Sequence, residues 1–247
     1  MLLLALLWQP TASMAQRNPV INLPKYDLAP YHFGFILAGN QMFYTLKPVD
    51  GHVFASFEHI NDDKEFPTAA EELYLYEVTA RPTPGFTIGI VGNLRLGNHF
   101  DLRFVPSLAF GERHLDYHIY QDSDTLVQVT KSNASTFVDF PLHIKFRSKR
   151  HNNMAAYLIS GLKYSLDLAS DKKNEDKNNE LPVRMNQNDL AVDVGVGFDF
   201  YTNYFKFGIE AKMSYGIFDI LVPAGYVYTG GLERVNNKIF QLSFTFE

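Results

Sequence analysis

The sequence contains no cysteine and only one tryptophan among its 247 residues. The absence of cysteine excludes disulfide bonds, thiol chemistry and a lipid-modified N-terminal cysteine. Charges of the two signs are nearly balanced, because 22 basic and 27 acidic side chains give a formal net charge of −5. No basic stripe is present either, so the composition does not suggest a nucleic-acid-binding protein.

The chain also lacks an apolar run long enough to form a transmembrane helix. The N-terminal run MLLLALLW is too short to span a bilayer, and Pro10 follows it. Ser13 and Ala15 are small residues at the spacing of a cleavage site, so we expect residues 1–15 to be a signal peptide that is removed before Gln16. An exported chain without a spanning helix can cross a membrane only as strands.

A period of two dominates the rest of the sequence. Large apolar residues alternate with polar ones in eight stretches, as in the C-terminal FQLSFTFE, and most stretches are long enough for a tilted strand to cross hydrocarbon, which takes about 9–11 residues. The candidate strands are Tyr31–Tyr44, Gly85–Leu96, Phe100–Phe110, Val138–Phe146, Ala156–Leu168, Leu190–Phe200, Phe205–Ile217 and Phe240–Glu247.

The connections between these stretches alternate between short and long. The short ones are Gly97-Asn98, Ser148–Asn153 and Thr202-Asn203, and the long ones are Thr45–Pro84, Ala169–Gln187 and Asp219–Asn236. This alternation is typical of outer-membrane barrels, which have tight periplasmic turns and long outer loops, whereas a soluble Greek-key sandwich does not require it. We therefore predict an all-β fold, an eight-stranded antiparallel transmembrane β-barrel of residues 31–247. Residues 16–30 would form a short periplasmic N-terminal arm, and both termini would lie on the periplasmic side of the outer membrane.

The polar faces of the candidate strands carry many charges. An eight-stranded barrel is narrow enough for side chains to fill its interior, so we expect these charges to pair inside it and to leave no diffusion pore. The predicted basic members are Arg95, Arg103, Lys145, Lys163, Lys206 and Lys212, and the predicted acidic members are Asp101, Asp139, Asp193, Asp199 and Glu210.

The alternation changes phase after Phe110. Its apolar residues lie at even positions before Gly111 and at odd positions after it, which predicts a β-bulge at Gly111. The following Glu112–Lys131 segment, with turn residues Asp122–Asp124, is predicted to form a two-stranded extracellular ribbon. The loop segment Asp171–Glu180 is highly charged and has no apolar residue, so we expect it to be solvated.

No catalytic motif is evident in the sequence. The GxSxG, HExxH and P-loop patterns are all absent. His114, Asp116 and His118 fall on one face of the predicted ribbon, where such groups could activate a water molecule or bind a metal. A solvated polar edge is the simpler interpretation, so we assign no catalytic, cofactor-binding or metal-binding residue and expect that the protein is not an enzyme.

Several stretches resemble the PorT family, outer-membrane β-barrel components of the type IX secretion system of Bacteroidetes. The stretches that carry the resemblance are NLPKYDLAPYHFGFILAGNQM, PGFTIGIVGNLRLGNHFDLRFVPSLAFGERHLDY, VDFPLHIKFRSKR, VGVGFDFYTNYFKFGIEAKMSYG and FQLSFTFE. They lie between Asn22 and Glu247, nearly the whole chain that follows the expected signal peptide. The PorT family has no established active site, so no functional residue is transferred from it.

The resemblance implies a non-enzymatic component or assembly factor that exports proteins with C-terminal sorting domains, and in gliding bacteria secretes adhesins. Outer-membrane lipid and other secretion proteins would be its partners, with no nucleic acid and no identified small-molecule substrate. Two alternatives stay open from the residues alone. One is a rim hydrolase that uses His114, Asp116 and His118, and the other is a conduit for small apolar solutes.

Overall fold

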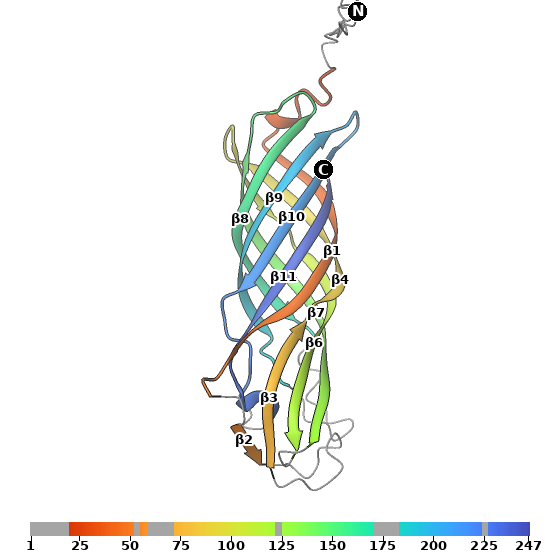
Figure 1. The fold of residues 1–247 in the computed structure, drawn as a ribbon. Coiled ribbons are helices and arrows are strands. Elements are labelled where there is room, and N and C mark those ends of the chain that lie inside the picture. Colours follow the sequence, from red (N-terminus) through yellow and green to blue (C-terminus); the bar gives the residue numbers. More distant parts are fainter. Residues whose placement is uncertain (1–19, 52–54, 59–71, 122–124, 170–182, 224–226) are drawn as a thin grey trace, which may run out of the picture.

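The computed structural model describes residues 20–51, 55–58, 72–121, 125–169, 183–223 and 227–247. The expected signal peptide, the turn Asp122–Asp124 and the charged segment Asp171–Glu180 lie outside these residues. The described part is mainly β-strand and forms one long barrel with a sheet extending from one end (Figure 1). No helix in this part is long and apolar enough to cross a membrane.

The strands follow one another along the chain with two very short helices. In order the elements are η1 (Tyr26–Leu28), β1 (Tyr31–Pro48), β2 (Ala55–Glu58), β3 (Glu72–Arg81), β4 (Thr83–Arg95), β5 (Phe100–Phe104), β6 (Ser107–Gln121), β7 (Thr125–Arg147), β8 (Met154–Asp167), β9 (Asn188–Tyr201), β10 (Lys206–Gly216), α1 (Val227–Gly230) and β11 (Leu232–Phe246). Every strand that the sequence predicts is present.

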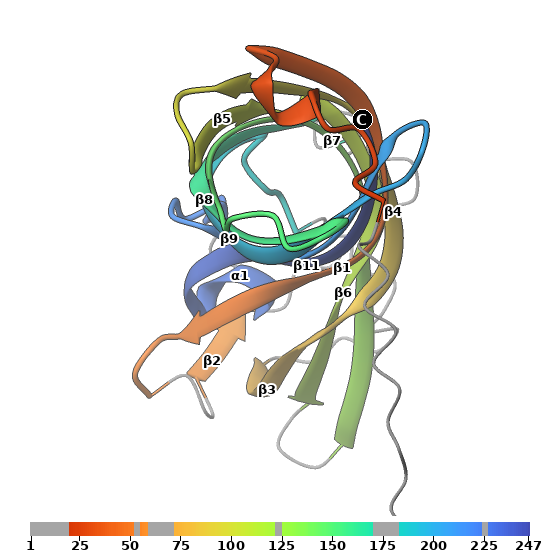
Figure 2. The same ribbon diagram turned by 90° about the horizontal axis from the view of Figure 1, so that it is seen from above.

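Eight antiparallel positions close the barrel, as the view along its axis shows (Figure 2). β1 closes the ring, because it pairs with β11 on one side and with β4 on the other. β5 and β6 together fill one position, since both pair with β4 and β7, and Val105-Pro106 interrupts them where proline cannot donate to the ladder. The prediction of an eight-stranded antiparallel transmembrane barrel is confirmed.

The two ends of the barrel differ. The turn end holds the short connections β4–β5, β7–β8 and β9–β10, together with residues 20–30 and the C-terminus. The loop end holds the long connections and the extended sheet. Between the two ends, the outward positions are apolar and exposed, as at Phe33 (70%) and Ile90 (62%), while the inward positions are buried. Because exposed apolar side chains encircle the wall, they suit a hydrocarbon surrounding rather than water.

The extended sheet at the loop end corrects the prediction of a two-stranded ribbon. β6 and β7 do form a long hairpin, but β3 pairs with the free edge of β6 and β2 pairs with β3. Two strands of the sheet therefore come from Thr45–Pro84, which was expected to be a loop. A two-stranded ribbon alone is marginally stable, and the added strands cover an edge that would otherwise be unpaired.

The predicted bulge at Gly111 is wrong. β6 and β7 stay in unbroken register from Ser107↔Asp139 to Gln121↔Thr125, and odd residues face inward along both strands. The chemistry of the two faces changes at Gly111, not the direction of the side chains. Beyond this residue the outward face becomes polar, and the inward face of β6 becomes apolar, with Leu115, Tyr117 and Ile119 fully buried.

These inward side chains belong to an apolar core at the loop end. The core joins β1, β3, β6, β7, β11 and α1 with the segments that connect β8 to β9 and β10 to β11. Its buried members are Tyr44, Leu73, Leu75, Leu115, Tyr117, Ile119, Val129, Val183, Ile220, Leu221, Val227, Tyr228, Leu232 and Val235. The loop end therefore has a core of the kind found in a soluble domain, whereas the apolar clusters described inside the rest of the barrel have only four and three buried members.

Candidate functional site

The interior of the barrel contains a balanced set of buried charges. Eight basic and eight acidic side chains lie there, each at most 10% exposed. The basic ones are Arg103, Arg113, Lys131, Lys145, Arg147, Lys163, Lys206 and Lys212, and the acidic ones are Asp101, Asp139, Asp167, Asp189, Asp193, Asp199, Glu210 and Glu247. Burying charge is costly unless each group is paired, so the pairing decides what this interior can do.

Arg103 on β5 and Lys206 on β10 organise the charges nearest the turn end. The Arg103 guanidinium donates to Glu210 at 2.8 Å and lies 3.7 Å from the Glu247 carboxylate. Lys206 donates to the same Glu247 at 2.7 Å. The Tyr157 hydroxyl donates to Glu210 at 3.1 Å. The C-terminal residue thus turns its side chain into the barrel and is held by two cations.

The middle of the barrel repeats this pattern. Lys145 on β7 donates to Asp199 on β9 at 2.7 Å. His143, also on β7, lies 2.8 Å from Asp193, and the ammonium of Lys212 is 3.8 Å from the same carboxylate. Each carboxylate comes from a different strand than its partner, so the pairs link β7 to β9 past β8 and join β9 to its neighbour β10.

The charges nearest the loop end are held by Arg113 and Asp139. Arg113 donates to Asp167 at 3.1 Å and also to Ser135 and Asn237. Its guanidinium lies 4.5 Å from the Tyr44 ring centroid, where the charged network meets the apolar core. Asp139 accepts a hydrogen bond from Ser165 at 2.6 Å and lies 3.8 Å from Lys163.

Most of the predicted interior residues take the predicted place. Members of the predicted basic set pair with members of the predicted acidic set in Arg103–Glu210, Lys145–Asp199, Lys163–Asp139, Lys206–Asp199 and Lys212–Asp193. Asp101 is buried and accepts a hydrogen bond from Asn93 at 3.4 Å. Arg95 corrects the prediction: it is the last residue of β4 and its side chain donates to Gly97 O and Asn98 Oδ1 of the adjoining turn. Because Arg95 lies at the end of the strand, its side chain binds the adjoining turn and not a buried carboxylate.

The predicted set of interior charges did not include several members of the network. Arg113, His143, Arg147, Asp167, Asp189 and Glu247 all lie on the inward phase of their strands. The alternation alone could have placed His143 and Asp167 inside the barrel, because both lie on the polar faces of the candidate strands Val138–Phe146 and Ala156–Leu168. Arg113 was hidden by the supposed phase change at Gly111.

Residues of the expected N-terminal arm cover the turn end. Asp27 accepts hydrogen bonds from Arg147 and, at 2.8 Å, from the Tyr201 hydroxyl. Tyr26 stacks on His32 with ring centroids 3.9 Å apart, and burial raises the pKa of its hydroxyl above the ordinary value. The backbone N–H of Asn22 donates to Asn153 Oδ1 at 2.9 Å. These contacts fasten the arm to β1, β7, β9 and the β7–β8 turn.

The loop end is closed by the apolar core and α1. The Tyr117 hydroxyl donates to the backbone oxygen of Tyr228 in α1 at 2.9 Å, and the Lys131 ammonium lies 4.5 Å from the Tyr228 ring centroid. Below this closure, a cavity of about 10 Å³ lies among Lys163, Asp189 and Ser214. A space of this size holds about one water molecule, so side chains nearly fill this part of the lumen.

The three ribbon residues considered for catalysis do share one outward face of β6. Asp116 accepts a hydrogen bond from Thr130 at 2.7 Å and lies 3.4 Å from Arg81. His114 is 3.7 Å from Glu112, and His118 is 4.0 Å from Glu77. Each residue therefore meets a partner on its own sheet, and the described residues include no cluster of three or more metal-ligating side chains. The turn residues Asp122 and Asp124, which are near in sequence, lie outside the described residues.

Several solved protein structures match this chain at low sequence identity and low TM-score. The Ail attachment invasion locus protein of Yersinia pestis is 10% identical, with a TM-score of 0.38 and coverage of 88% of this chain and 99% of that chain. OprG of Pseudomonas aeruginosa is 10% identical, with a TM-score of 0.35 and coverage of 86% and 92%. A FadL homologue of Pseudomonas aeruginosa is 8% identical, with a TM-score of 0.26 and coverage of 88% and 90%. No curated protein matches the sequence.

A family model decides the membership of the chain. The model of the outer membrane protein beta-barrel domain matches residues 32–222, which is well over half of the sequence. The match begins in β1 and extends beyond β10, so it includes most of the ring and the extended sheet. The chain therefore belongs to the outer membrane protein beta-barrel domain family.

Proposed function

We propose that this outer-membrane barrel is a non-enzymatic component or assembly factor of the type IX secretion system, required to export proteins with C-terminal sorting domains. The observation that carries the proposal is the interior, which is filled by paired charges and closed at both ends. Such a barrel offers no passage for protein cargo, so its contribution must come from its surface. The specific link to type IX secretion is supported by the resemblance of Asn22–Glu247 to the PorT family.

The proposed orientation places the turn end and both termini in the periplasm. Tight turns on the periplasmic side and long loops outside are the rule for outer-membrane barrels. The sheet of β2, β3 and the outer halves of β6 and β7 would then stand at the cell surface, leaning to one side of the barrel axis (Figures 1 and 2). We infer that this sheet and the periplasmic arm contact other secretion proteins.

Shortening the Glu112–Lys131 hairpin tests the proposed contact surface. We expect secretion of sorting-domain cargo to fall while the level and heat-modifiable migration of the barrel stay normal. Because Leu115, Tyr117 and Ile119 belong to the apolar core, a second variant leaves that core intact. Tyr76→Ala with Tyr120→Ala removes an aromatic pair with ring centroids 5.7 Å apart, of which Tyr76 is 44% exposed. Normal secretion in both variants would remove the sheet from the mechanism.

A conductance measurement tests the closed interior separately. We expect no steady large conductance when the folded protein is inserted into a planar bilayer, since the interior charges are paired and the ends are covered. A large steady current would contradict the filled and closed interior on which the proposal is based. Charged side chains dominate the interior, and the apolar clusters among them are small: Met42, Ala109, Phe137 and Ile239 form one, and Ile36, Val91 and Val105 form the other. The His114, Asp116 and His118 contacts favour a solvated surface, so neither alternative function is proposed.

A further inference from the structure

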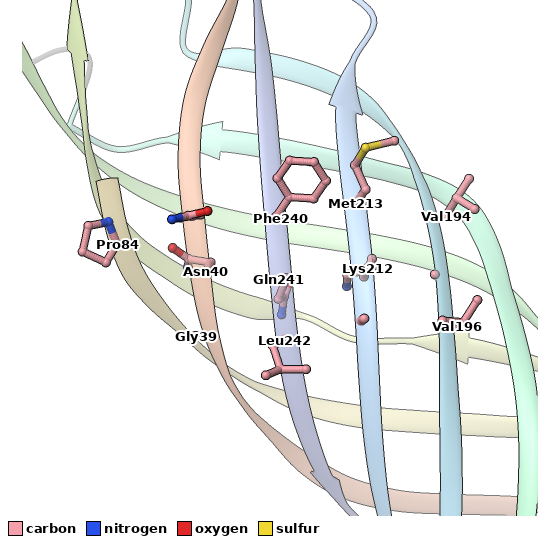
Figure 3. A pocket seen from close by; sticks show the side chains of 13 residues that line it. Gly39, Asn40, Pro84, Val194, Val196, Lys212, Met213, Phe240, Gln241 and Leu242 are labelled. Carbon is pink, nitrogen blue, oxygen red and sulfur yellow. The ribbon is translucent and has the colours of Figure 1, made fainter. Parts of the chain in front are cut away.

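A hollow of about 730 Å³ lies on the outer wall over β9, β10, β11 and β1 (Figure 3). Gly39 and Ala211 are small outward residues, and larger side chains from the neighbouring strands surround them. A Cβ atom added at Gly39 would meet nothing within 4 Å, so the space above this residue is open. The surrounding outward side chains are Gln41, Pro84, Val194, Val196, Met213, Phe240 and Leu242.

A lysine stands at the loop-end side of this hollow. Lys238 is the outward residue that follows Phe240 along β11 toward the loop end, and its cross-strand neighbours are Phe43 and Tyr215. Its ammonium lies 5.6 Å from the Phe43 ring centroid and 5.4 Å from that of Phe240. No salt bridge joins it to any acidic residue in the described part of the chain. Lys238 is thus a cation that lies near two aromatic rings at the loop-end border of the apolar wall.

Two further cations extend the positive charge beyond Lys238. Arg234 and Lys47 face each other across β11 and β1, four residues along β11 from Lys238 toward the loop end. Arg234 donates to the Ile217 backbone oxygen, which holds its side chain along the wall. Lys47 pairs with Glu233 at 2.7 Å, but both members are more than half exposed, so this pair neutralises little.

We propose that the hollow and Lys238 together bind one anionic lipid of the leaflet at the loop end. The phosphate of the headgroup would contact the Lys238 ammonium, and part of an acyl chain would lie over Gly39 and Ala211. Leu242, at the far side of the hollow, is four residues from Lys238, or about 14 Å along an extended strand, which a single acyl chain spans. Lysines at such borders extend their charge toward headgroups. The proposal does not depend on a role in secretion.

Native mass spectrometry of the folded protein tests the site. Wild type should retain phosphatidylglycerol over diacylglycerol, which has no phosphate, and inorganic phosphate should not displace the lipid. Lys238→Ala should reduce phosphatidylglycerol retention about fivefold, the effect of losing one cation near an anionic headgroup. Gly39→Leu should reduce retention of both lipids because it fills the hollow.

Two matched variants control for general effects. Lys149→Ala removes an exposed lysine at the turn end, and Ser160→Leu fills a different hollow, between β5, β7, β8 and β9. Both should keep wild-type retention and heat-modifiable migration. Unchanged phosphatidylglycerol retention in Lys238→Ala, equal retention of diacylglycerol by wild type, or displacement by inorganic phosphate would each overturn the proposal.

Discussion

The middle of the barrel and its loop end use opposite chemistry on the same strands. In the middle, side chains of β7 such as His143 and Lys145 face inward as a charged network, and apolar residues such as Ile144 face outward. At the loop end, Val129 on the same strand faces an apolar core while Thr130 faces outward. The alternation of β7 does not change phase between these two regions. The residue type at each position therefore follows from what surrounds the strand: lipid or water on the outside, and charges or an apolar core on the inside.

Removing Arg103 should break the charged middle most severely. Arg103→Met leaves Glu210 and Glu247 buried without this cation, and we expect a loss of about 3–5 kcal/mol in the free energy of unfolding. Denaturant titration of the protein folded in vesicles measures it. Arg95→Met is the matched control, because Arg95 binds only a turn, and the double variant Arg103→Met with Glu210→Gln should regain part of the loss. Equal stability of the two single variants would contradict the paired interior.

A cavity in the loop-end core should have a smaller and more local effect. Leu115 is fully buried there, and Leu115→Ala should cost about 3 kcal/mol in local stability. We expect limited proteolysis to cut the extended sheet faster, while heat-modifiable migration of the barrel remains normal. Loss of the folded barrel in this variant would show that the two regions do not unfold separately.

The outward polar face of the sheet should tolerate substitution. Replacing His114, Asp116 and His118 together with Ala removes contacts that are partly exposed, so we expect less than about 0.5 kcal/mol change in stability per site. Secretion of sorting-domain cargo should continue. Disappearance of a hydrolytic activity in this triple variant would instead favour the hydrolase.

The smallest effect is expected outside both regions. The Asp171–Glu180 segment contains only charged and asparagine residues, so it offers no apolar anchor for a partner. Its deletion should leave secretion and barrel level unchanged. A clear secretion defect would mean that a charged loop contributes contacts that its composition does not indicate.

Much of the fold was predictable because a barrel strand repeats every two residues. The eight barrel strands, the outward Phe246 and Phe244 of the final strand, and the inward placement of Lys145, Asp199, Arg103 and Glu210 followed from alternation and a narrow barrel. Which cation meets which carboxylate did not follow. The sheet extension by β2 and β3 was not predicted, because β2 has only four residues and β3 contains the Leu and Tyr run Leu73–Tyr76, which does not alternate apolar with polar residues. The prediction for Arg95 was wrong because a residue at a strand end has the inward phase but can also bind the adjoining turn.

The sequence by itself determined which face of each barrel strand is polar and that eight strand positions close the barrel, since both follow from local alternation. Only the tertiary structure decided what each face meets. Gly111 illustrates the difference: the same register continues through it, yet apolar residues stop facing outward and begin facing inward. Whether an apolar face lies against lipid or against a core depends on distant segments such as α1 and β3, which a strand's own sequence does not encode.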